Sequence, residues 1–191
     1  AESDADARLL FCPTPYCDRM DQQSHGGRGY LDVLGRELAE PIDILWTGPE
    51  IISAEIPIAS IRRLSERIAR PPVLWDNLFA NDYDLRRCYV GPYSGRPAEL
   101  TAHVRGILIN PNNEYPLNEV PLETFASYLA EGRQYEPRAA FLTGIDRWLA
   151  SYEPVRRSFS RDELLLLADC YYLPHQQGPT AETLYRAAAT L

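Results

Sequence analysis

Short, continuously hydrophobic runs alternate with longer amphipathic stretches along the first 110 residues. Each run is followed by a polar or turn-forming cluster, and the four runs are residues 9–12, 42–46, 73–75 and 106–109. They recur about every 30 residues. Runs this short and uniformly apolar are typical of parallel strands that are buried on both faces.

Helical periodicity fills the intervals between these runs. In residues 58–68, hydrophobic side chains recur every three or four positions after Pro57, which suits the start of a helix. Residues 122–129 show the same spacing, and Gly132 is placed to cap the end of that helix. Strands and helices that alternate at this period predict βαβ units with right-handed crossovers.

After about residue 133 the strand pattern stops and only helical patterns follow. Residues 141–152 carry an amphipathic stripe of apolar and aromatic side chains. Ser160 and Glu163 have the spacing of a capping box, and Thr180 is predicted to cap a last helix. We therefore expect residues 133–191 to form an α-helical region that packs on the α/β part or follows it.

Composition and charge narrow the classes of function. The 191 residues include 27 acidic and 19 basic side chains, and every basic one is arginine. Without lysine, the chain has no Schiff-base lysine and no phosphate-loop lysine. The net charge of −8 argues against nucleic-acid binding, which needs clustered positive charge. No apolar stretch approaches the ~18 residues of a membrane span, so a soluble, cytoplasmic chain without a membrane partner is expected.

Metal and cofactor chemistry has no support in the sequence. The cysteines form no CxxC pair, and the three histidines have no partner at the spacing of metal ligands. Free thiols in a reducing compartment are therefore expected at Cys12, Cys17, Cys88 and Cys170. We predict neither a metal nor a cofactor.

The predicted topology is half of a barrel. Four βα units occupy roughly 120 residues here, whereas a complete eight-unit barrel needs about 250. A small open sheet is the alternative, but open doubly wound sheets usually have a glycine-rich phosphate turn after the first strand, and this chain does not. The sequence therefore favours an α/β fold in which residues 1–132 form half of a (β/α)8 TIM barrel.

Polar and aromatic side chains gather directly after the predicted strands, where barrels build active sites. They lie in residues 75–77, 81–83 and 110–112. Carboxylates and amides form paired hydrogen bonds with sugar hydroxyls, and aromatic faces pack on C–H surfaces. The mixture therefore predicts a site for a neutral sugar. The structural alternative is that these residues form Asx turns or cap the next helices.

Several motifs carry a family resemblance, and they occur in one order along the chain. They are Phe11-Cys12-Pro13-Thr14-x-Tyr16-Cys17, Leu45-Trp46-Thr47-Gly48-Pro49, Val73-Leu74-Trp75-Asp76-Asn77, Ala80-Asn81-Asp82-Tyr83-Asp84, Gly91-Pro92-Tyr93-x-Gly95-Arg96 and Asn110-Pro111-Asn112. Together they resemble glycoside hydrolase family 84, the O-GlcNAcases and related β-N-acetylglucosaminidases. Residues 167–179 resemble the helical region that follows the barrel in animal-type members.

This resemblance implies a (β/α)8 barrel, of which the chain matches strands five to eight. It also implies retaining, substrate-assisted hydrolysis, in which the acetamido oxygen of the sugar attacks the anomeric carbon and forms an oxazoline. The family uses adjacent aspartates after the fourth strand, and this sequence contains no Asp-Asp pair. The catalytic pair is therefore expected upstream, and the segment alone is expected to be inactive. A non-catalytic glycan-binding or structural half-barrel is the alternative.

The resemblance also assigns substrate-binding roles. Asp82 is expected to accept hydrogen bonds from the 4- and 6-hydroxyls of the sugar, with Asn112 beside it, and Asn77 to lie near the acetamide. The acetamide pocket is expected to be lined by Tyr16, Trp75 and Cys12. Packing alone is the alternative role for Trp75 and Cys12. Residues 18–29, which are polar and rich in glycine, are expected to form a mobile loop at the border of the substrate groove.

The implied partners follow from the same resemblance. The ligand is an N-acetylglucosamine-bearing protein or glycan. Half a barrel leaves two strand edges unpaired and its inner face uncovered. We therefore expect either a complementary N-terminal half-barrel or a homo-oligomer to cover them.

Overall fold

The computed structural model describes residues 8–84, 86–151 and 160–189. The chain divides into two compact units. The first contains residues 1–77 and 99–109, and the second contains residues 78–98 and 110–191. The predicted boundary at residue 132, between the half-barrel and the helical region, stays a prediction.

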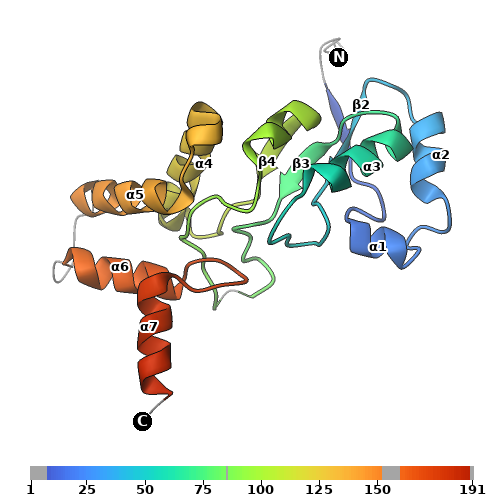
Figure 1. Ribbon diagram of the computed structural model, residues 1–191. Coiled ribbons are helices and arrows are strands. Elements are labelled where there is room, and N and C mark those ends of the chain that lie inside the picture. The colour runs from blue at the N-terminus through green and yellow to red at the C-terminus, as the bar shows by residue number, and fades with distance from the viewer. Residues whose placement is uncertain (1–7, 85, 152–159, 190–191) are drawn as a thin grey trace, which may run out of the picture. The chain divides into compact units, whose positions relative to one another are not determined.

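The first unit holds a parallel sheet of four strands in the order β1-β2-β3-β4 (Figure 1). The strands are β1 (Leu9–Phe11), β2 (Ile42–Trp46), β3 (Val73–Asp76) and β4 (Gly106–Ile109). Each of the four hydrophobic runs therefore forms a strand, and each strand pairs with the next one along the chain. The predicted α/β fold with a parallel sheet is confirmed.

Along the chain, helices connect the strands of this unit. They are α1 (Asp18–Gln22), α2 (Tyr30–Glu37), α3 (Ile58–Ile68) and the 3-10 helix η1 (Ala98–His103). The hydrophobic stripe predicted for residues 58–68 is buried, because Ile61, Leu64 and Ile68 join the core that also contains Ile44 and Trp46 of β2. Burying each such side chain contributes about 1.5–3 kcal/mol to folding.

Helix α1 occupies residues 18–22 of the loop predicted over residues 18–29, so that part of the prediction is wrong, while residues 23–29 form no helix. This five-residue helix has no buried residue, so no hydrophobic periodicity announces it. Side-chain pairs attach it to α3 instead: Ser60 Oγ donates to Asp18 Oδ2 at 2.5 Å, and Arg67 Nη1 donates to Asp21 Oδ2 at 2.5 Å. Arg67 also pairs with Asp32 of α2, so one guanidinium connects three helices.

The second unit contains the remaining helices. They are η2 (Tyr115–Asn118), α4 (Glu119–Glu131), η3 (Gly132–Gln134), α5 (Pro137–Ser151), α6 (Arg161–Cys170) and α7 (Pro179–Ala188). Gly132 ends α4 with a φ of 57°, which confirms its predicted role as the cap. The capping box of Ser160 and Glu163 is also present at the start of α6.

Two details of this unit concern the predicted helices. Thr180 is not the cap of α7: Gly178 precedes the helix, Pro179 is its first residue, and the Thr180 N–H donates to Asp169 Oδ2 at 2.9 Å. The stripe predicted over residues 141–152 lies on α5, where Phe141 and Ile145 are buried, while residue 152 lies outside the described residues.

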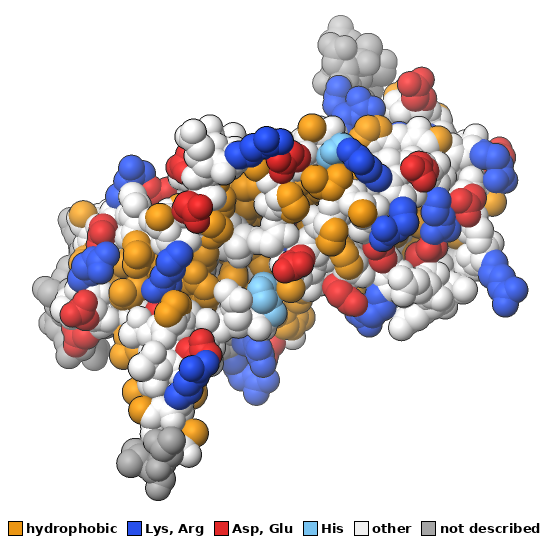
Figure 2. Space-filling view, viewed as in Figure 1, with side chains coloured by type: hydrophobic (Ala, Val, Ile, Leu, Met, Phe, Trp, Pro, Cys, Tyr) orange, Lys and Arg blue, Asp and Glu red, His pale blue; other side chains and the backbone are white. Residues whose placement is uncertain are grey.

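Not all hydrophobic side chains of this unit are covered. Figure 2 shows hydrophobic side chains interspersed with charged ones over α4 and α5. Leu122 and Leu129 of α4 are 42% and 52% exposed, although they belong to the predicted helical stripe. Among the residues that the structure describes, no helix is long and apolar enough to cross a membrane.

Gly91 permits a close backbone contact within the second unit. Its N–H donates to the Tyr172 carbonyl at 2.7 Å, and a Cβ at this position would lie 2.3 Å from that oxygen. We expect Gly91→Ala to lower the free energy of unfolding by about 1–3 kcal/mol, because the backbones must move apart. Gly106→Ala is the matched control in urea unfolding, since nothing lies within 4 Å of its added Cβ. Equal stability of the two variants would contradict this prediction.

Candidate functional site

An aromatic pair in the first unit joins two of the predicted site residues. Trp75 lies in β3, next to its carboxyl end, and its ring centroid is 6.1 Å from that of Tyr16, with the planes inclined at 43°. Both side chains are half-buried. The carbonyl of Tyr16 accepts hydrogen bonds from the N–H of Thr47 at 2.8 Å and from its hydroxyl at 3.2 Å. The loop after β1 is thus attached to the end of β2, and it holds the Tyr16 ring near Trp75.

Asn77 fixes the neighbouring turn. Its side chain is buried, and Nδ2 donates to the carbonyl of Ile51 at 2.8 Å. Within the same turn, Ser53 Oγ donates to the Thr47 carbonyl at 2.9 Å, and Gly48 has a φ of 99° that favours glycine. The structure therefore places Asn77 directly after β3 as a residue that orders the polar turn after β2.

Cys12 follows β1 and is exposed. Its Sγ contacts the carbonyl of Pro13 at 3.8 Å, and partial burial raises the pKa of the thiol above its ordinary value. A thiol with a raised pKa stays neutral near pH 7, so it is a poor nucleophile. Cys12 is therefore suited to contacting a ligand as a neutral group and not to attacking it.

Asp82 lies in the second unit on an exposed turn. Among the described residues, its carboxylate makes no hydrogen bond or ion pair. The preceding residue, Asn81, is fully buried, so the turn has a fixed base. Both oxygens of Asp82 are therefore available to hydroxyl groups of a ligand.

Asn112 also lies in the second unit, but unlike Asp82 its side chain is bonded within the protein. Its side chain is 3% exposed, and Nδ2 donates to the Tyr89 carbonyl at 2.8 Å and to Asn118 Oδ1 at 2.9 Å. Both amide protons are thus used inside the protein. Asn110, in the same polar cluster, is half-buried directly after β4.

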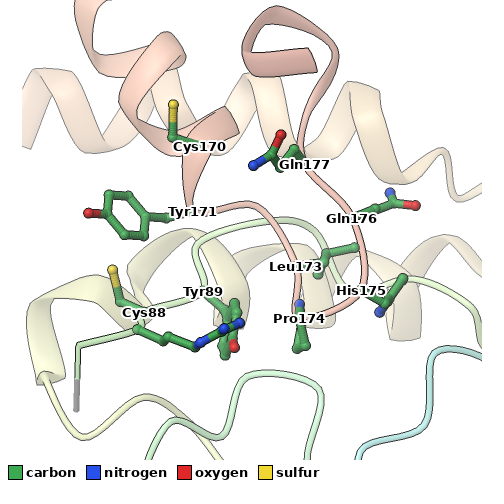
Figure 3. Close-up of a pocket in the computed structure, with 10 residues that line it drawn as sticks. Cys88, Tyr89, Cys170, Tyr171, Leu173, Pro174, His175, Gln176 and Gln177 are labelled. Carbon is green, nitrogen blue, oxygen red and sulfur yellow. The ribbon is translucent and has the colours of Figure 1, made fainter. Parts of the chain in front are cut away.

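A hollow of about 360 Å³ in the second unit contains none of the predicted site residues (Figure 3). Cys170 and Tyr171 at the end of α6, the turn that follows them, and Cys88 and Tyr89 line it. The structure describes no group of three metal-ligating side chains in residues 8–84, 86–151 and 160–189.

Asp18, two residues after Tyr16, gives the region a pH-dependent contribution to stability. Burial raises the pKa of its carboxyl above 3.8, and the hydrogen bond from Ser60 opposes that rise. The folded state then binds this proton more tightly than the unfolded chain does. The stabilising contribution is therefore fully present below the unfolded pKa and is lost as the pH rises through the folded pKa.

We expect Asp18→Asn to be at least as stable as the wild type at pH 7, because the amide oxygen still accepts from Ser60. This advantage should shrink as the pH is lowered to 4, because the wild-type carboxyl takes up its proton as the pH falls through its raised pKa. Urea unfolding at both pH values measures the difference. Asp32→Asn is a control of opposite sign, because Arg67 lowers the pKa of Asp32. A difference between wild type and Asp18→Asn that does not change with pH would refute the assignment.

Tyr16 and Trp75 lie at the carboxyl end of the parallel sheet, the end at which enzymes with a barrel fold build their active sites. Comparison with known proteins identifies the class of enzyme. The family model described as beta-N-acetylglucosaminidase matches residues 1–161. The chain therefore belongs to this family, glycoside hydrolase family 84.

Individual relatives support the same placement. The chain is 46% identical to the protein O-GlcNAcase of Rattus norvegicus over 120 residues, which cover 63% of this chain and 13% of that protein. The Mus musculus protein O-GlcNAcase is 45% identical over the same shares. A solved structure of a Thermobaculum terrenum O-GlcNAc hydrolase mutant matches with a TM-score of 0.70 and 32% identity, covering 86% of this chain and 32% of that one. The chain thus spans a minor part of each relative's length.

Proposed function

We propose that this chain is part of a retaining, substrate-assisted β-N-acetylglucosaminidase that removes O-linked N-acetylglucosamine from Ser or Thr of proteins, or acts on related N-acetylglucosaminides. In this proposal the chain supplies groups that bind the sugar and its acetamide. The family match and the names of the relatives, O-GlcNAcase and O-GlcNAc hydrolase, support the reaction class.

The strand order supports a half-barrel. A sheet that adds each new parallel strand on the same side, β1 to β4, lacks the reversal at which open doubly wound sheets bind their ligands. Both edge strands expose leucines: Leu9 and Leu10 of β1 are 61% and 48% exposed, and Leu108 of β4 is 45% exposed. We infer that these strands are the fifth to eighth of a (β/α)8 barrel. A complementary N-terminal half, or another copy of the chain, would then cover the edges.

The observation that carries the proposal is the Tyr16–Trp75 pair at the carboxyl end of the sheet. In substrate-assisted hydrolysis, the acetamide must be folded so that its oxygen reaches the anomeric carbon. An apolar wall that restricts the acetamide supplies this orientation before the reaction begins. We propose that Tyr16, Trp75 and Cys12 form this wall and that Asn77 orders its polar side.

Asp82 has a separate role in this proposal. Its exposed carboxylate accepts hydrogen bonds from the 4- and 6-hydroxyls of the sugar. The two adjacent aspartates of the family would come from another segment, since the sequence holds no Asp-Asp pair. The lack of an Asp-Asp pair also favours a second candidate function, a glycan-binding module without catalysis.

Calorimetry tests the acetamide-binding role. The chain is titrated with a stable mimic of the N-acetylglucosamine oxazoline and with a matched sugar that has a hydroxyl in place of the acetamide. We expect the mimic to bind more tightly, and Trp75→Ala to remove the difference between the two ligands. Equal affinity of the wild type for both ligands would overturn the assignment of the acetamide wall.

A further inference from the structure

The turn that carries Asp82 is attached at both ends to one other segment of the second unit. Asn81 precedes the turn and is fully buried, and Tyr89 follows it and is 4% exposed. Both residues bond to residues 112–118, the segment that leads into α4. The position of the Asp82 carboxylate therefore depends on these attachments.

At the first attachment, the Asn81 side chain uses three hydrogen bonds. Nδ2 donates to the Arg87 carbonyl at 2.8 Å and to Glu114 Oε2 at 2.7 Å. Its Oδ1 accepts from the Asn113 N–H at 2.9 Å. Asn81 thus closes the turn on itself through Arg87 and connects it to the neighbouring segment.

At the second attachment, the Asn112 side chain forms hydrogen bonds with both the N–H and the carbonyl of Tyr89. Its Oδ1 accepts from the Tyr89 N–H at 2.8 Å, and its Nδ2 donates to the Tyr89 carbonyl at 2.8 Å. This paired contact specifies one orientation of the Tyr89 peptide groups. The Tyr89 hydroxyl lies 2.6 Å from that of Tyr83, the residue after Asp82.

Asn118 in turn holds Asn112. Its Oδ1 accepts from the Asn112 backbone N–H at 2.8 Å and from Nδ2 at 2.9 Å, and its Nδ2 donates to the Asn112 carbonyl at 2.9 Å. Both asparagines are 3% exposed. Buried amides that satisfy each other in this way fix a single arrangement, because any shift would leave a polar group unpaired.

We propose that Asn112 is a positioning residue for Asp82. With Asn118 it fixes Tyr89, and through Tyr89 and Tyr83 it holds the Asp82 carboxylate where it can select the 4-hydroxyl of the sugar. The inference rests on the proposed function of Asp82, and it replaces direct sugar binding by Asn112.

The test is the ratio of affinities for the oxazoline mimic and for its 4-deoxy form, measured by calorimetry on the full chain. A hydrogen bond to a charged group corresponds to a ratio of about 10 to 100 in the wild type. Asn112→Asp keeps the shape but loses both amide donors, and we expect its ratio to fall to about 1–3. Asn113→Asp adds the same charge at the exposed neighbouring position and should keep the wild-type ratio.

A merely structural role for Asn112 would weaken both ligands equally and leave the ratio unchanged, and that result would overturn the inference. Asp82→Ala should bring the ratio to about 1, and adding Asn112→Asp should lower it no further. If Asp82→Ala keeps the wild-type ratio, the proposed role of Asp82 fails as well, so the two failures are distinguishable. If Asn112→Asp does not fold, Asn118→Ser provides the same comparison, with a smaller expected fall and faster hydrogen exchange at the Tyr89 amide.

Discussion

Replacing Asp169 by alanine is expected to lower the free energy of unfolding by about 1.5–3 kcal/mol, because its charged hydrogen bonds are lost while Arg138 keeps partial contact with water. The Asp169 side chain is fully buried, and Arg138 donates to its two oxygens at 2.6 and 3.1 Å. The same carboxylate accepts from the Thr180 N–H at the start of α7. The Arg138 guanidinium lies 4.7 Å from the ring centroid of Phe141 and 5.4 Å from that of Tyr172. Removing Asp169 leaves this cation among aromatic rings without its partner.

Urea unfolding followed by circular dichroism measures the loss. Asp146→Ala is the matched control, because it breaks the exposed ion pair with Arg161 and should change stability little. The Asp169 variant should also release α7, which hydrogen exchange at the Thr180 amide would detect. A loss no larger than that of Asp146→Ala would show that the Arg138–Asp169 pair does not connect α5, α6 and α7.

Replacing Asp82 by alanine is expected to weaken binding of the oxazoline mimic by about 10- to 100-fold. The carboxylate is exposed on a turn with a buried base and has no partner among the described residues, so its loss removes hydrogen bonds to the ligand and few to the protein. A hydrogen bond to a charged group contributes about 1.5–3 kcal/mol, which corresponds to this range of affinity.

Asp82→Asn should show a smaller loss, because one oxygen acceptor remains. Calorimetry gives both affinities, and thermal unfolding checks that neither variant is destabilised. An unchanged affinity in Asp82→Ala would exclude this residue from the sugar site. That result would hold independently of the test of the acetamide wall.

The strands and α3 were predictable because the pattern of hydrophobic residues in each segment indicates which side chains are buried. A run such as Ile42–Trp46 has few ways to fold other than as a strand covered on both faces, and the stripe on α3 faces the core it predicts. The capping box of Ser160 is equally local, since its two hydrogen bonds join residues three positions apart.

Features that depend on distant residues were not predictable in this way. Helix α1 is held by Ser60 and Arg67, which lie more than 40 residues away in the chain, so its own sequence resembles a loop. The helix start assigned to Thr180 was wrong because Pro179 suits a first helical position and because Asp169 binds the Thr180 N–H.

The candidate site shows the same limit. Asp82 and Asn112 both follow the predicted strands in polar clusters, and the sequence offers no physical reason to separate them. Only the folded structure shows that the Asn112 amide donates its hydrogen bonds to Tyr89 and Asn118, whereas Asp82 is exposed. Position after a strand therefore indicates where a barrel generally builds its active site, but not which side chain remains available to a ligand.

We propose that this chain contributes sugar-binding groups to a family 84 active site whose catalytic carboxylates lie in another segment. The direct measurement is the initial rate of hydrolysis of an aryl β-N-acetylglucosaminide by the purified chain, alone and joined to an N-terminal half-barrel that carries paired aspartates. We predict no turnover above the spontaneous rate for the chain alone and clear turnover for the joined protein. Turnover by the chain alone, or a joined protein that folds but neither binds nor cleaves the glycoside, would contradict this account.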